Sequence, residues 1–279
     1  MRIHLGYNHC MTENKRPQIL LTNDDSIDSP GLWAAAEVLS ELGFVHVVAP
    51  RVQQTAMGRA LPRESDHIVD EREVLVNGKL WPVFAVGGSP AQAVLHGVLG
   101  LMSVVPDLVV SGINYGENVA SGVTISGTIG AALEGASFGY PSLAVSLQTS
   151  VQEHFSLSDG IDFSVAAHFT KLFAEKLLRK RMPFDVDVLK VDVPAGATVE
   201  TPWKLTTQSR QRYFEASSTT DPVSGKKHIS YEMLLDEEKI ERNSDLRTVL
   251  LDQLVSVTPL SLDLTSRVDF GDLGRLLEK

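Results

Sequence analysis

The segment ILLTNDD at residues 19–25 indicates the fold class. It starts as a run of aliphatic residues and ends abruptly in an asparagine and two aspartates. The segment VVSGINYGEN at residues 109–118 has the same form, with glycines, amides and an acid after the apolar run. Continuous apolar strands are typical of parallel sheets that are covered on both faces, and open α/β folds bind ligands at the carboxyl ends of such strands. The two segments therefore predict buried strands whose ends face one polar site.

Strand and helix patterns alternate along most of the chain. Strands are expected at 18–22, 44–49, 107–111, 142–146 and 186–192, and a hairpin at 68–76 and 80–86 around Asn77-Gly78. Helices are expected at about 30–42, 89–101, 128–138 and 159–181, and polar loops at 51–66 and 112–127. This order predicts an α/β fold with a doubly wound, mostly parallel, Rossmann-like sheet and right-handed crossovers.

The pattern changes after Pro194. Residues 201–250 are charged, with scattered aromatic residues, and we expect them to form an extended C-terminal arm or hairpin for oligomerisation. The α/β core is expected to span residues 18–200, with the strand and helix of residues 251–279 returning to it, and residues 1–17 to be a loose extension. Because an isolated hairpin is marginal in water, we expect the arm to pack on a second subunit. The alternative is an arm folded back on its own core.

Composition restricts the classes of partner. The 279 residues are 43% hydrophobic, enough for a full core, and the formal charge of −10 argues against binding a nucleic-acid polymer. A small anionic substrate remains compatible if a bound cation masks the local charge. Cys10 is the single cysteine, so a disulfide framework is excluded and a reducing compartment is favoured. No apolar run approaches the roughly 20 residues of a membrane span, so we expect a cytoplasmic protein without a membrane partner.

The polar strand ends predict metal and phosphate chemistry. Adjacent Asp24 and Asp25 offer oxygen ligands, which favour magnesium, manganese or calcium over zinc. The alternative is a turn rich in Asn and Asp that only caps the following helix. The second loop adds neutral amides, and Ser126-Gly127-Thr128 opens a helix whose free N–H groups suit a phosphate. Together these features predict a hard-metal site for phosphate chemistry.

The chain resembles the SurE family of survival-protein 5′/3′-nucleotidases. The resemblance lies in an ordered set of motifs spread over most of the chain after residue 18. These are LLTNDD at 20–25, SPGL at 29–32, VVAP at 47–50, GSP at 88–90, PDLVVSGINYGEN at 106–118, SGTIGAALEG at 126–135 and SVTPL at 256–260.

The resemblance implies which residues form the site. It implies a divalent metal, magnesium or manganese, held by Asp24, Asp25, Thr55 and Asn114, and phosphate contacts from Asn118, Ser126, Gly127 and Thr128. It also implies a homodimer or homotetramer. Five positions depart from the family pattern: Ser26 stands where glycine is usual, Thr55 where serine is usual, Ser89 where threonine is usual, Gln92 where aspartate is usual and Ile125 where tyrosine is usual.

We therefore expect a metal-dependent phosphomonoesterase acting on nucleoside 5′-monophosphates, with 3′-monophosphates left open. Asp24, Asp25, Asn118 and Thr128 are the expected catalytic residues. An aspartyl-phosphate mechanism is disfavoured, because it needs an acid two residues after the nucleophile, where Ser26 and Ile27 stand. A non-catalytic nucleotide or metal sensor remains the alternative from another functional class.

Overall fold

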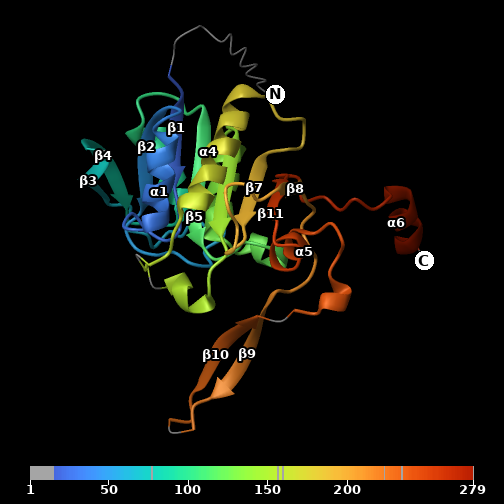
Figure 1. Cartoon of the computed structure of the whole chain (residues 1–279). Helices are drawn as coiled ribbons and strands as arrows, with labels where there is room; N and C mark the ends of the chain where they lie inside the picture. Colours follow the sequence, from blue (N-terminus) through green and yellow to red (C-terminus); the bar gives the residue numbers. More distant parts are fainter. Residues whose placement is uncertain are drawn as a thin grey trace.

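A single large sheet forms the body of the protein. The computed structural model describes residues 16–278 except positions 77, 156, 159, 223 and 234. In this described part, nine strands form a sheet in the order β3-β4-β2-β1-β5-β6-β7-β11-β8 (Figure 1). The strands are β1 (Gln18–Thr22), β2 (Phe44–Pro50), β3 (Val69–Val76), β4 (Lys79–Val86), β5 (Leu108–Tyr115), β6 (Ser142–Leu147), β7 (Val188–Val193), β8 (Trp203–Leu205) and β11 (Val255–Leu260).

The strand directions confirm the expected doubly wound, mostly parallel sheet. Strands β4, β2, β1, β5, β6 and β7 run parallel, whereas β3 pairs antiparallel with β4 and β11 pairs antiparallel with β7. The chain winds from β1 to β2 on one side and later returns to β5 on the other side. The direction of winding therefore reverses at β1, and ligand sites of open α/β sheets lie at the carboxyl end of that position.

Helices cover both faces of the sheet. Helices α1 (Pro30–Leu39) and α4 (Ser164–Arg179) pack together on one face, and α2 (Pro90–His96) and α3 (Gly127–Ser137) pack together on the other. Helix α2 continues into a π-helix over Gly97–Leu101, and short 3-10 helices span Ala120–Thr124, Val151–Phe155 and Glu237–Lys239. In the described residues no helix is both long and apolar enough to cross a bilayer.

Strand β5 is longer than its apolar run indicates. The expected strand ended at Ser111, but pairing with β6 resumes after an irregularity and reaches Tyr115 opposite Leu147. Gly112 has a φ of +128°, and the peptide bond that follows it is cis. The prediction of a loop from residue 112 was therefore wrong, because glycine permits the irregular turn that keeps the polar residues in the strand. Asn114 consequently sits on the sheet itself.

The C-terminal arm is shorter than expected. Strands β9 (Phe214–Thr220) and β10 (Lys227–Met233) form an antiparallel hairpin that extends away from the body (Figure 1). The remainder of 201–250 belongs to the body, since β8 joins the sheet and helix α5 (Asp245–Leu250) packs beside β11 and β7. A small apolar cluster anchors this region, formed by Val119, Ala120, Tyr213, Ile240, Leu246 and Val249. In the described residues the hairpin contacts the body at its base, where Phe214 packs against this cluster and the Tyr213 hydroxyl donates to Met233 Sδ.

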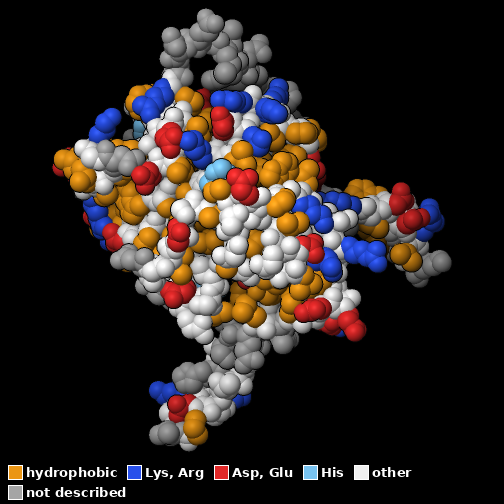
Figure 2. Space-filling view, in the orientation of Figure 1, with side chains coloured by type: hydrophobic (Ala, Val, Ile, Leu, Met, Phe, Trp, Pro, Cys, Tyr) orange, Lys and Arg blue, Asp and Glu red, His pale blue; other side chains and the backbone are white. Residues whose placement is uncertain are grey.

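At the C-terminal end of the chain, the position of the last helix differs from expectation. Strand β11 joins the sheet as expected, but helix α6 (Phe270–Leu277) buries none of its residues and lies apart from the body (Figures 1 and 2). The structure differs here from the expected return of this helix to the core, since none of the helix residues is buried. Of the predicted N-terminal extension, residues 1–15 lie outside the described residues.

Candidate active site

Asp24 and Asp25 lie at the carboxyl end of β1, where the winding of the sheet reverses. Both side chains are buried, with 4% and 2% of their surface exposed. The backbone turns directly after them at Ser26, whose φ is +92°, and the side chain of Asn23 donates a 2.9 Å hydrogen bond to the Ser26 carbonyl. Ser29, not an aspartate, is the N-cap of α1. The aspartates are therefore not explained as a helix cap.

The start of helix α3 holds Asp24. The Thr128 hydroxyl donates a 2.5 Å hydrogen bond to Asp24 Oδ1, and the backbone N–H groups of Gly127 and Thr128 also interact with this carboxylate. A Cβ atom on Gly127 would lie 2.7 Å from Asp24 Cβ, so only glycine permits this approach. The helix start that the sequence assigns to phosphate is thus directly beside the carboxylate assigned to metal.

Asp25 is held by strand β5 and by the loop that follows β2. The backbone N–H of Tyr115, on β5, donates a 3.1 Å bond to Asp25 Oδ2, and Gln53, which follows β2, donates a 3.2 Å bond to Oδ1. The same Gln53 amide donates to the carbonyl of His154 at 2.7 Å. Sequence reasoning missed Gln53, and its only signal was its position shortly after a predicted strand that ends at the same edge.

The two carboxylates repel each other in a buried site. Burial raises the pKa of Asp24 to about 6, although hydrogen bonds from Thr128 and nearby backbone groups oppose this shift. Burial and the charge of Asp24 together raise the pKa of Asp25 well above its usual value. No basic side chain contributes to either shift within the described part of the chain. Two buried acids without a cationic partner are suited to a bound cation, which would favour their ionised forms.

The donor set matches a hard cation. In the described residues no three side chains from His, Cys, Asp and Glu gather as a metal site. A cation here would therefore take two carboxylates and complete its shell with neutral oxygens and water, as magnesium and manganese do. Asn114 offers one such oxygen: its Nδ2 donates to the carbonyls of Tyr115 and Gly116 at 3.0 and 2.7 Å, which leaves Oδ1 as the group able to bind a metal.

Thr55 is close to the site in sequence and stays a prediction as a ligand. The backbone N–H of Gln54 donates a 2.7 Å bond to the carbonyl of Asp24, so the loop after β2 touches the end of β1. Thr55 is the next residue, exposed at the start of a turn in which Ala56 has a φ of +61°. Its hydroxyl makes no contact that fixes it on Asp24 or Asp25.

Asn118 is fixed through both its backbone and its side chain. Its N–H donates to Asp192 Oδ1 and its Nδ2 donates to Ser146 Oγ, each at 2.8 Å. Ser126 is the N-cap of α3, and its hydroxyl oxygen accepts a bond from the N–H of Ile129 at 3.2 Å. The hydroxyl hydrogen of Ser126 is therefore available to a ligand, whereas that of Thr128 is committed to Asp24.

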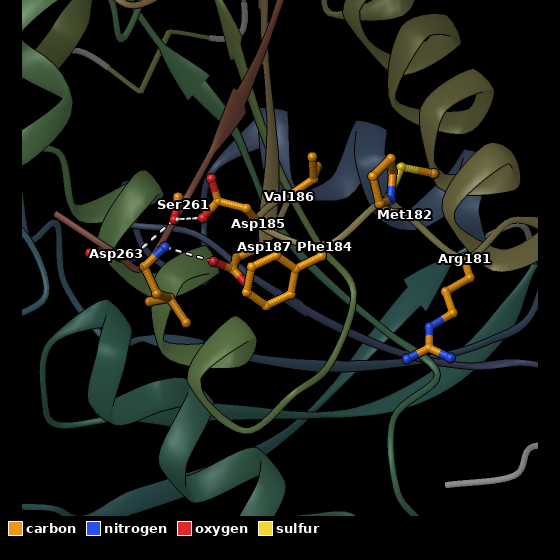
Figure 3. A pocket seen from close by; sticks show the side chains of 10 residues that line it. Arg181, Met182, Phe184, Asp185, Val186, Asp187, Ser261 and Asp263 are labelled. Atoms are coloured by element: carbon orange, nitrogen blue, oxygen red, sulfur yellow. Dashed lines mark hydrogen bonds between the residues drawn. The ribbon is translucent and has the colours of Figure 1, made fainter. Parts of the chain in front are cut away.

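One hollow in the described surface lies away from this site. A cavity of about 510 Å³ lies between the segment 181–187 and the residues after β11, at the amino end of β7 (Figure 3). Two hydrogen bonds tie its walls together, from Ser261 to Asp185 and from the N–H of Leu262 to Asp187. Because the aspartate pair lies at the carboxyl ends of the parallel strands, this cavity is at the opposite edge of the sheet.

Comparison with known proteins identifies the family. A family profile described as Survival protein SurE matches residues 19–215, the part of the chain that carries the site. This chain belongs to the SurE family. It is 39% identical to the 5′-nucleotidase SurE of Thermococcus gammatolerans over 93% of this chain and 96% of that protein. It is 41% identical to the 5′-nucleotidase SurE of Archaeoglobus fulgidus over 91% of this chain and 94% of the relative.

A solved SurE structure confirms the fold. The SurE protein from Aquifex aeolicus superposes with a TM-score of 0.73 at 32% identity, covering 94% of this chain and all of the other. The α/β class and the family resemblance predicted from sequence are both confirmed.

The departures from the SurE pattern have distinct structural settings. Ser26 occupies a positive φ that favours glycine, so the serine stands in a strained conformation. Gln92 accepts bonds from Ser89 N–H and Ser65 and donates to the Pro62 carbonyl, which fastens the loop after β2 to the start of α2. Ile125 is about half exposed immediately before Ser126. None of the three replaces Asp24, Asp25, Asn114 or Asn118.

Proposed function

We propose that this chain is a metal-dependent phosphomonoesterase that hydrolyses nucleoside 5′-monophosphates to nucleoside and phosphate. One observation carries the proposal: two buried carboxylates, without a basic partner in the described residues, meet the start of α3 where the winding of the sheet reverses. The naming of several relatives as 5′-nucleotidases supports the same activity.

Asp24 and Asp25 would hold a magnesium or manganese ion, with Asn114 Oδ1 and the Thr55 hydroxyl as neutral ligands. When bound, such a cation supplies Lewis acidity to the phosphoryl group and makes an attacking water more acidic. We assign acceptance of the water's proton to the aspartate pair. These assignments rest on the oxygen-rich donor set and on the resemblance of the motifs.

Asn118 and the first turn of α3 would bind the phosphoryl oxygens. Asn118 keeps one Nδ2 hydrogen beyond its bond to Ser146, and Ser126 keeps its hydroxyl hydrogen. The backbone N–H groups of Gly127 and Thr128 interact with Asp24 in this structure, so they would contribute to phosphate binding only by sharing their hydrogen bonds with that carboxylate. Fixed donors of this kind stabilise charge on the equatorial oxygens during in-line attack without reorganising at that moment.

We also propose a cytoplasmic homodimer or homotetramer. The projecting hairpin and the solvent-facing helix α6 expose Ile229, Phe270, Leu276 and Leu277, which a second subunit would cover. The single cysteine is consistent with a reducing compartment.

Release of inorganic phosphate tests the proposed activity. The purified chain is incubated with a panel of 5′- and 3′-monophosphates in magnesium, in manganese and in a chelator. We expect metal-dependent release from 5′-monophosphates. Binding of nucleotide without release, detected by calorimetry, would instead identify the sensor.

A further inference from the structure

Strand β7 contains a lysine and an aspartate that are completely buried. All six residues of VLKVDV are buried, and the side chains of Lys190 and Asp192 have no exposed surface. They are two residues apart, so they point to the same face of the strand. Burying opposite charges costs free energy that their attraction only partly offsets, and apolar residues of similar volume often serve stability as well or better. The pair therefore calls for an explanation other than stability.

A third buried residue completes the network. Lys190 Nζ lies 2.5 Å from Asp192 Oδ2 and 3.0 Å from Asp245 Oδ2. Asp245 opens helix α5 and is also fully buried. The backbone N–H groups of Ser209 and Leu246 donate to its second oxygen, Oδ1, at 2.9 and 2.7 Å.

Both acids reach the loop that follows β5. Asp192 Oδ1 accepts the N–H of Asn118 at 2.8 Å, and Asp245 Oδ2 accepts the N–H of Ala120 at 3.1 Å. Lys190 thus bridges two carboxylates, and these accept hydrogen bonds from two backbone N–H groups of the same loop, those of Asn118 and Ala120. The Asn118 side chain is held separately by Ser146 on β6. Backbone and side chain of Asn118 are therefore anchored to adjacent strands, β7 and β6.

We propose that Asp192 is a positioning residue that sets the backbone of Asn118 so that its amide meets the phosphoryl group. The inference rests on the role of Asn118 in the proposed function. Asp192 makes the direct contact with the Asn118 backbone, and Lys190 compensates the buried charge of Asp192 and Asp245, so a neutral acceptor at position 192 does not need the lysine. A displacement of about 1 Å in a group that contacts the reacting atoms can cost on the order of 100-fold in rate.

Two double variants separate positioning from charge. In Lys190→Met/Asp192→Asn the net charge of the three side chains stays at minus one, and the asparagine oxygen can still accept the Asn118 N–H. Lys190→Met/Asp192→Leu has the same charge and an apolar pair but no acceptor. We expect both to unfold cooperatively. We expect kcat within about threefold of the parent for the first variant and lower by about tenfold or more for the second.

Combining the two double variants with Asn118→Ala tests whether the loss of kcat depends on the Asn118 side chain. In Asn118→Ala, the Asn and Leu versions of position 192 should have equal kcat, because the side chain to be positioned is gone. Thr170→Val, which alters a buried hydroxyl bonded within helix α4, is the matched control for a loss of core polarity away from this loop. If the role is purely structural, the difference in kcat between Asn and Leu at position 192 will be the same with Asn118 present as with Asn118→Ala. That result overturns the proposal.

Amide hydrogen exchange provides a readout that needs no turnover. The Asn118 N–H should remain protected in Lys190→Met/Asp192→Asn and exchange at least tenfold faster in Lys190→Met/Asp192→Leu. Equal protection in the two folded variants contradicts the inference. Absence of phosphate release by the parent chain counts against the proposed function alone, since the exchange comparison still decides whether Asp192 positions Asn118.

Discussion

Thr128 donates a 2.5 Å hydrogen bond to Asp24, although 104 positions separate the two residues in the chain. This bond joins the end of β1 to the first turn of α3. The proposed metal site and the proposed phosphate site are therefore in direct contact, and a substitution in one is expected to alter ligand binding in the other.

The raised pKa of Asp24 predicts how pH affects the metal-free protein. The pKa rises from 3.8 to about 6 in the folded state because the carboxylate is buried, so folding favours the protonated form. The contribution to stability is fully present below about pH 4 and is lost as pH rises through about 6, with a magnitude on the order of 3 kcal/mol. In a chelator, we expect the melting temperature of the parent relative to Asp24→Asn to fall between about pH 4 and pH 6.5 and to level off above that range. An unchanged difference between the two proteins would contradict the assigned cause.

Removal of either carboxylate is expected to abolish turnover. Asp24→Asn and Asp25→Asn should each lower kcat by orders of magnitude while leaving circular dichroism unchanged, because both residues follow a strand end. Chelation should do the same to the parent, and magnesium or manganese should restore it. Asp28→Asn is the matched control, since Asp28 is exposed and pairs only with Arg72 in the described structure. Full activity of the metal-stripped parent would overturn the mechanism.

The sequence predicts the parts of the site that depend on strand ends. Asp24, Asp25 and Asn118 each follow an apolar run, and the parallel sheet brings such ends together regardless of details. The extension of β5 to Tyr115 escaped prediction, because it depends on pairing with Leu147 across an irregularity. Gln53 escaped because its contact with Asp25 is set by loop geometry.

The two charged residues inside the apolar strand at 186–192 indicate a buried ion pair, a feature that the hydrophobic periodicity used to predict the strand does not reveal. Lys190 and Asp192 have opposite charge and a spacing of two, which places them on one face of a strand. That pattern predicts a buried ion pair, but its partner Asp245 comes from a segment expected to be part of the arm. For the solvent-facing helix α6, the local sequence pattern predicts that a helix forms, but it does not predict which surface covers the apolar side of that helix.

Glycine at position 127 is predicted to be essential for the geometry around Asp24. In Gly127→Ala the new Cβ would lie 2.7 Å from Asp24 Cβ, a distance that requires the helix start or the carboxylate to move. We expect at least a tenfold weaker affinity for manganese, measured by calorimetry, and a corresponding loss of kcat. Gly100→Ala, where nothing lies within 4 Å of the added atom, should leave both unchanged. Normal metal affinity in a folded Gly127→Ala protein would refute this geometry.

The projecting hairpin is predicted to form a subunit interface. Light scattering of the full chain at micromolar concentration should give the mass of a dimer or tetramer. Replacing residues 214–233 with a short glycine-rich linker should shift the mass towards the monomer while the body stays folded, because β9 and β10 pair only with each other in the described structure. A monomeric parent chain would show that the hairpin does not mediate assembly.

Thr55 is predicted to bind the metal directly or through a water. The contact between Gln54 N–H and the Asp24 carbonyl brings the loop to the carboxylates, and threonine offers the same hydroxyl as serine with a more restricted χ1. Thr55→Ser should therefore change manganese affinity less than about twofold, whereas Thr55→Val keeps the shape, loses the oxygen and should weaken binding about tenfold. The alternative is a threonine that bonds only its own loop backbone. In that case Thr55→Ser and Thr55→Val would bind manganese equally well, and a structure with manganese would show the hydroxyl turned away from Asp24 and Asp25.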